Sequence, residues 1–193
     1  MVEFKHRLVE IKKAFDSLQK SNVSEQIESA LGLIVPSLER RQPMLVCGNG
    51  GSAADALHIT GELVGRFLID RKALNVICLS TNVSVITAWA NDYEYESIFA
   101  RQVEAHGLRG GVLFCLSTSG NSKNVLRALK VAKQMGLSTV GMTGKGGGLM
   151  AQFCDVLIDV PSNSTPRVQE MHLVVYHYIC ERIEAAIISK PNE

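Results

Sequence analysis

The sequence predicts an α/β fold, in which a five-stranded, parallel, doubly wound sheet follows two N-terminal helices. The first observation is a set of five short apolar runs, at residues 44–48, 75–80, 111–117, 138–143 and 155–160. The second is that the segments between these runs carry apolar residues at helical spacing. Continuous apolar runs that alternate with helices are typical of a parallel sheet covered by helices on both faces.

Two helices are expected before the first strand. The first has an apolar stripe suited to docking on another helix, which is made of Phe4, Leu8, Ile11, Phe15 and Leu18. The second opens near Ser24 and runs towards Arg41, and Pro36 predicts a kink or an early stop in it. No linker follows, so residues 1–193 are expected to form a single domain, with the helices of residues 1–41 packed on it.

Composition excludes several classes of protein. The 193 residues include 20 basic and 19 acidic side chains, so the chain has no large basic field for nucleic acid or acidic membranes. The five cysteines are widely spaced and form no CxxC pair, which is typical of reduced thiols. The N-terminal residues also lack an apolar signal core. We therefore expect a cytoplasmic protein with no nucleic-acid or membrane partner.

A glycine turn follows the first expected strand. Residues 48–53 nearly match the dinucleotide fingerprint GxGxxG/A, but the second strand ends in Ser80 and Thr81 instead of the acidic residue that holds a ribose. Without that residue, dinucleotide binding is not favoured. The glycines still let backbone N–H groups approach an anion or a sugar oxygen, and the alternative is that they only permit a tight turn.

A turn rich in hydroxyl groups, residues 117–123, follows the third expected strand and precedes an amphipathic helix. Unpaired N–H groups at a helix start and several hydroxyls favour binding of a phosphomonoester. The alternative is that Ser119 or Asn121 simply caps the helix. The later Thr143–Gly146 segment has Thr139 where a nucleotide-binding P-loop requires glycine, which argues against nucleoside triphosphates.

Ionisable side chains form a stripe on the helix after the glycine turn. Asp55, His58 and Glu62 fall within about 60° of one another on one helix face. Such a stripe can supply metal ligands or an acid/base pair, or it can be a solvated face. The last helix is expected from about residue 166 to 189. Gln169 and His177 lie about two turns apart on it, within reach of one pocket. We assign His172 to the hydrogen-bonded core.

Taken together, these motifs resemble the bacterial phosphoheptose isomerase family, whose members are single sugar-isomerase (SIS) domains of the flavodoxin-like type with two leading helices. The resemblance covers nearly the whole chain. Its motifs occur in the family order, as residues 47–52, His58, Glu62, Arg66, residues 91–93, residues 117–122, residues 143–145 and residues 166–177.

The resemblance implies an aldose–ketose isomerase that converts sedoheptulose 7-phosphate to D-glycero-D-manno-heptose 7-phosphate through an enediolate. It implies one Zn²⁺ per subunit, held by His58, Glu62, Gln169 and His177, with Glu62 and His177 as the catalytic acid/base pair. The substrate-binding residues it implies are Asn49, Gly50, Gly51, Ser52, Glu62, Arg66, Asn91, Asp92, Ser117, Thr118, Ser119, Ser122 and Gln169. Members of the family are homotetramers with active sites between subunits.

A second interpretation is a non-catalytic SIS protein that binds the bacterial replication initiator DnaA. That group resembles this chain over the same length but lacks the acid and the histidine that match Glu62 and His177. Because this sequence has both residues, the resemblance favours the enzyme.

Overall fold

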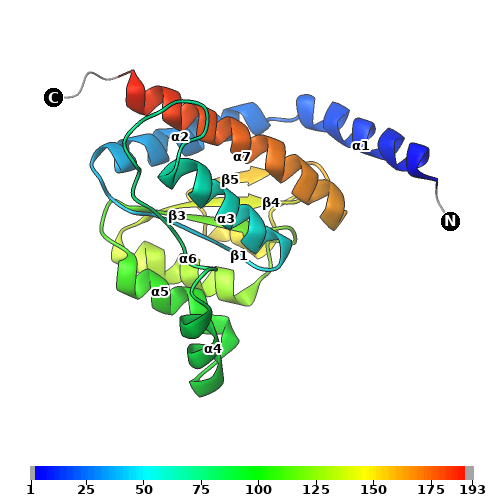
Figure 1. The fold of residues 1–193 in the computed structure, drawn as a ribbon. Helices are drawn as coiled ribbons and strands as arrows, with labels where there is room; N and C mark the ends of the chain where they lie inside the picture. Colours follow the sequence, from blue (N-terminus) through cyan, green and yellow to red (C-terminus); the bar gives the residue numbers. More distant parts are fainter. Residues whose placement is uncertain (1–2, 190–193) are drawn as a thin grey trace.

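The computed structural model describes residues 3–189 and contains one five-stranded parallel sheet in the order β2-β1-β3-β4-β5 (Figure 1). This is the flavodoxin-like order. All five strands lie within the apolar runs named above, so the predicted fold class is confirmed. The strands are β1 (Met44–Gly48), β2 (Val76–Cys78), β3 (Val112–Ser117), β4 (Ser138–Thr143) and β5 (Val156–Asp159).

Helices cover both faces of the sheet. Figure 1 shows α2, α3 and α7 on one face and α5 and α6 on the other, while α4 hangs from the second layer and α1 extends away from the body. The helices are α1 (Phe4–Gln19), α2 (Val23–Glu39), α3 (Gly51–Val64), α4 (Val83–Asp92), α5 (Ile98–His106), α6 (Lys123–Met135) and α7 (Thr165–Ile188), with 3₁₀ turns η1 (Tyr95–Ser97) and η2 (Gly148–Gln152). Within residues 3–189 no helix has the length and apolarity needed to cross a bilayer.

Two hydrophobic cores explain why the strands read as unbroken apolar runs. Along β1, Met44 and Val46 pack under α2, α3 and α7, whereas Leu45 and Cys47 pack under α5 and α6. Successive side chains of a strand point to opposite faces, so a sheet covered on both faces needs apolar residues at every position. The same arrangement fixes which turns meet at the edge of the sheet.

The two leading helices behave differently. In α2, Pro36 lies close to the C-terminal end, and the helix stops at Glu39. The expected stripe of α1 docks only through its C-terminal half, where Phe15 and Leu18 pack against the core of the α2–α3–α7 layer. At the other end, Phe4 is 73% and Leu8 is 48% exposed. The first half of the stripe is therefore uncovered in one chain.

The turns after β1 and β3 are neighbours at the carboxyl edge of the sheet. β1 and β3 are adjacent, but the next strand after β1 lies on one side of this pair and the next strand after β3 lies on the other. Connections that leave in opposite directions open a crevice outside the carboxyl ends of the strands, where ligands bind in doubly wound folds. The glycine turn and the hydroxyl turn flank this crevice.

His172, on the inner face of α7, is fully buried, as expected. Its Nε2 lies 3.2 Å from the carbonyl oxygen of Thr143, and its Nδ1 is buried without a hydrogen-bond partner. Burial disfavours the charged imidazolium and lowers the pKa of His172 to about 4, although the contact with Thr143 acts in the opposite direction. The native protein therefore holds this histidine neutral.

We predict that His172 makes the protein sensitive to mild acid. Between pH 6.5 and pH 4 the unfolded chain takes up a proton that native His172 resists, so stability falls as pH drops and the loss reaches roughly 3 kcal/mol. Denaturant unfolding at several pH values should show a shallower loss for His172→Gln. His6→Gln, which alters an exposed histidine of α1, should keep the slope of the parent. Equal slopes for the parent and His172→Gln would exclude this source of acid sensitivity.

Candidate active site

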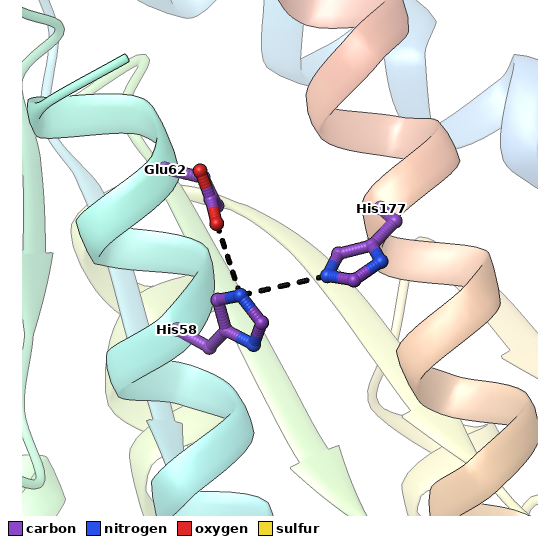
Figure 2. A group of neighbouring side chains, drawn as sticks. All are labelled: His58, Glu62 and His177. Carbon is purple, nitrogen blue, oxygen red and sulfur yellow. Dashed lines mark hydrogen bonds and ion pairs between the residues drawn. The ribbon is translucent and has the colours of Figure 1, made fainter. Parts of the chain in front are cut away.

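Three ligating side chains meet between α3 and α7. His58 Nε2 lies 2.9 Å from Glu62 Oε1 and 3.5 Å from His177 Nε2. One ligand atom of each residue lies within 4.8 Å of the others. Figure 2 shows His58 and Glu62 projecting from α3 towards His177 on α7. The expected stripe on α3 thus faces α7, although the side chain of His58 remains 41% exposed.

The packing of α7 on α3 holds His58 from behind. The hydroxyl of Tyr176, which is almost fully buried, lies 2.9 Å from His58 Nδ1 and 3.5 Å from Asp55 Oδ1. Burial raises the pKa of Asp55, while the hydrogen bond from Tyr176 and the nearby His58 lower it. Phe67 packs its ring 5.6 Å from that of His177. The sequence left the role of Asp55 open. In the structure, Asp55 holds the hydroxyl of Tyr176, and that hydroxyl contacts His58.

Gln169, the fourth expected metal ligand, lies further back along α7. Its side-chain amide packs on Gly51, where an added Cβ would lie 2.2 Å from Gln169 Nε2. Eight residues separate Gln169 from His177, a rise of about 12 Å along a helix. The structure thus brings His58, Glu62 and His177 together and leaves Gln169 beside the glycine turn. Its role as a ligand stays a prediction.

The glycine turn is tied to the start of α6 by a pair of amides. Asn49 Nδ2 donates to Asn124 Oδ1, and Asn124 Nδ2 donates to Asn49 Oδ1, each at 2.9 Å. Tyr95 adds a third bond, from its hydroxyl to Asn49 Oδ1 at 2.9 Å. In the turn itself, Gly50 has φ +56°, a conformation that glycine adopts without strain, and Ser52 is buried. The side-chain oxygen of Asn49 therefore accepts hydrogen bonds from two protein groups.

Neither Asn124 nor Tyr95 was found by the sequence analysis. Asn124 follows the hydroxyl turn directly, and the polarity of that segment was the one available signal. Its 3% exposure and its partner 75 residues earlier become evident only from the packed structure.

The hydroxyl turn exposes Ser119 and Asn121 at the start of α6. Ser117 Oγ and Ser122 Oγ lie 3.0 Å apart, and Ser119 Oγ accepts the N–H of Asn121. Ser122 is the N-cap residue of α6 and makes no side-chain capping bond. Neither Ser119 nor Asn121 caps this helix, so the capping alternative does not account for them. Asn124 Oδ1 accepts the N–H of Val125 in the first turn, and the N–H groups of Lys123 and Asn124 at the helix start suit a phosphate.

The loop after β4 supports this turn from below. Gly144 donates its N–H to the carbonyl of Thr118 at 3.0 Å, and Asn121 Oδ1 accepts the N–H of Leu149. Gly120 has φ +65°, and a Cβ there would lie 2.0 Å from the carbonyl oxygen of Gly147. The Thr143–Gly146 segment therefore braces the hydroxyl turn, a role that its sequence did not indicate.

Three other expected substrate residues are exposed in one chain. Arg66 is exposed just beyond the C-terminal end of α3, a helix about 20 Å long that begins at the glycine turn. Asn91 and Asp92 are exposed at the end of α4, where Asn91 Nδ2 donates to Asp92 Oδ1. Asp92 also lines a cavity of about 580 Å³ with Trp89 and with residues of β2 and α5. Their substrate contacts stay predictions.

Comparison with known proteins places this geometry in a family. Residues 8–144 match the family model of the SIS domain. A phosphoheptose isomerase of Crocosphaera subtropica is 45% identical over 96% of this chain and 92% of its own length. One of Helicobacter pylori strain P12 is 48% identical over 90% of this chain and 88% of its own length. The chain belongs to the phosphoheptose isomerase family of SIS-domain proteins.

Solved structures of this family share the fold. Phosphoheptose isomerase GmhA from Neisseria gonorrhoeae superposes with a TM-score of 0.88 at 36% identity, covering 94% of this chain and 96% of that one. A phosphoheptose isomerase from Francisella tularensis gives 0.82 at 33% identity, with 92% and 97% covered. The resemblance found from the motifs is confirmed, and the chain is an isomerase.

We predict that the hydroxyl turn binds phosphate. Replacing both Ser119 and Ser122 by Ala removes two hydroxyls beside the start of α6 and should weaken binding of inorganic phosphate by roughly 0.5–3 kcal/mol. Isothermal titration with phosphate measures this change. Ser29→Ala, on the exposed face of α2, is the control and should bind phosphate like the parent. Unchanged affinity in the double variant would locate the phosphate pocket elsewhere.

Proposed function

We propose that the protein interconverts sedoheptulose 7-phosphate and D-glycero-D-manno-heptose 7-phosphate. The observation that carries this proposal is the group of His58, Glu62 and His177 between α3 and α7, because a carboxylate beside two imidazoles suits proton transfer next to a carbonyl. The hydroxyl turn offers an anchor for the phosphate of the sugar. The similar proteins from Crocosphaera subtropica and Neisseria gonorrhoeae are phosphoheptose isomerases, which points to the same substrate class.

In the proposed reaction, a proton moves between the carbonyl carbon of the ketose, C2, and its neighbour C1. Glu62 takes the proton from C1 of the ketose, which leaves an enediolate, and the proton returns at C2 to give the aldose. His177 moves the second proton between the oxygens on C1 and C2, so no redox partner is needed. The phosphate anchor fixes the register of the sugar against these groups.

The donor set also fits zinc. Two imidazole nitrogens and one carboxylate are a typical catalytic zinc set. We propose that His58, Glu62 and His177 hold one Zn²⁺ per subunit and that Gln169 joins them. Bound there, zinc would act as a Lewis acid towards the carbonyl oxygen of the substrate.

We further propose a homotetramer whose active sites are completed by neighbouring subunits. The helices that carry the His58 group, α3 and α7, also expose apolar side chains, and they are Leu57, Val64, Leu173, Val174 and Tyr178. The uncovered half of α1 also exposes Phe4 and Leu8. Exposed apolar side chains on three helices favour an interface between subunits. A second copy could also supply residues such as Asn91 and Asp92, which are exposed on α4 in one chain.

We propose that residues 1–193 act as one domain in the cytoplasm. The five cysteines, all free in the structure, support a reducing compartment. The alternative function, DnaA binding without catalysis, predicts no isomerase activity in the parent protein.

We predict that Glu62→Gln lowers turnover by about 10²-fold or more, because the amide keeps the shape of the side chain but cannot take up the proton. Isomerase turnover with sedoheptulose 7-phosphate and deuterium incorporation from solvent at the reacting carbon measure the effect. Glu104→Gln, an exposed carboxylate on α5, is the matched control.

His177→Ala should cause a similar loss, and the two losses should not add if both residues serve one proton-transfer step. Comparable rates in Glu62→Gln and the parent would remove Glu62 from the mechanism. A parent without turnover or exchange would instead favour the DnaA-binding alternative.

We predict that bound zinc and activity fall together in His58→Ala, because one of the clustered nitrogen ligands is lost. Metal analysis and assays with and without a chelator measure this. His106→Ala, at the exposed end of α5, should match the parent. Active, chelator-insensitive protein without zinc would refute the metal and leave the acid/base pair in place.

We predict a particle of about four times the 21.0 kDa chain mass by light scattering at micromolar protein. Replacing Phe4 and Leu8 together by Ser should weaken assembly, because both belong to the uncovered stripe. A monomeric parent would refute the tetramer.

A further inference from the structure

A buried ion pair joins the loop after α3 to α7, and neither of its residues belongs to the His58 group. Arg71 Nε lies 3.1 Å from Glu184 Oε1, and the two side chains are only 3% and 1% exposed. Arg71 belongs to the loop between α3 and β2, and Glu184 belongs to α7. Burying two charges is costly, and apolar residues of similar size often stabilise a fold as well. The pair therefore calls for an explanation other than stability.

Glu184 organises the loop that follows α3. Its carboxylate accepts the backbone N–H groups of three successive residues, Phe67 at 3.0 Å, Leu68 at 2.7 Å and Ile69 at 3.0 Å. These bonds and the charge of Arg71 lower the pKa of Glu184, although desolvation acts in the opposite direction. A carboxylate that accepts three backbone N–H groups and pairs with Arg71 fixes the path of this short segment.

Arg71 fixes the C-terminal end of α3. One guanidinium nitrogen donates to the carbonyl of Glu62 at 2.8 Å, and another donates to the carbonyl of Gly65 at 3.2 Å. A cation on the last carbonyls of a helix satisfies acceptors that the helix leaves free and interacts favourably with its dipole. The guanidinium thus bonds directly to the backbone of the proposed catalytic base.

Glu184, the other residue of the pair, lies on the helix that carries His177. Glu184 lies seven residues after His177 on α7, a separation of about two turns that puts both on one side of the helix. The loop that it holds carries Phe67, whose ring packs on the imidazole of His177. A continuous set of contacts therefore runs from the backbone of Glu62 through Arg71 and Glu184 to His177.

We propose that Glu184 and Arg71 are positioning residues for the reaction. This role rests on the proposed function. The pair sets the separation of Glu62 on α3 from His177 on α7, and it packs Phe67 against the imidazole. A displacement of about 1 Å at a reacting group can cost 10²-fold in rate. The pair has no access to the substrate and acts only through the two helices.

The test is Glu184→Gln, whose amide hydrogens would face N–H groups that now donate to a carboxylate. We expect faster hydrogen exchange at the amides of Phe67, Leu68 and Ile69, and a kcat lower by about tenfold or more. Affinity for inorganic phosphate should stay within about twofold, because the hydroxyl turn lies at the edge of the sheet, away from this pair. Glu181→Gln, an exposed carboxylate on the same helix, should change none of the three.

If Glu184→Gln does not fold, Arg71→Lys keeps the charge beside Glu184 while removing the forked contacts to the carbonyls of Glu62 and Gly65. It should show the same split between kcat and phosphate affinity. Faster exchange at residues 67–69 with unchanged kcat in an active parent would overturn the proposal. So would equal losses of kcat and phosphate affinity, which indicate a general loosening. An inactive parent would refute the proposed function itself, and the catalytic role of the pair with it.

Discussion

Parallel pairing of β1 with β3 is the constraint on which the rest of the molecule depends. Parallel strands place every carboxyl end on one edge of the sheet, so the turns after β1, β3 and β4 must share one small space. Hydrogen bonds between these turns fill that space, from Asn49 to Asn124 and from Gly144 to Thr118. The crevice is thus built from backbone and amide groups before any ligand enters.

The ionisable group depends on a second consequence of the same pairing. Because α3 begins in the turn after β1, its direction is fixed by the sheet, and α7 lies beside it on the same face. Helices in this register bring His58 and His177 together. Tyr176, one residue earlier on α7, reaches His58 from the other side of the imidazole. The site therefore combines one set of groups at the sheet edge with another on a helix pair.

Local patterns predicted much of this arrangement. The strands were predictable because both faces of the sheet are buried, and the nearness of His58 to Glu62 follows from helical periodicity. The register of α7 on α3 was not predictable from periodicity, and it decides that His177 joins the group while Gln169 packs on Gly51. The bonds of Asn124 and Glu184 also depend on partners far away in the sequence.

The contact between Gly120 and Gly147 limits how the hydroxyl turn can diversify. A methyl group at either position would meet atoms closer than 2.5 Å, and both residues have positive φ. A library that randomised both loops would therefore keep glycine at these two positions in its folded members. Exposed neighbours such as Ser119 do not carry this constraint. The two glycines thus form a fixed frame, and an engineer can alter the exposed residues around it without rebuilding the sheet.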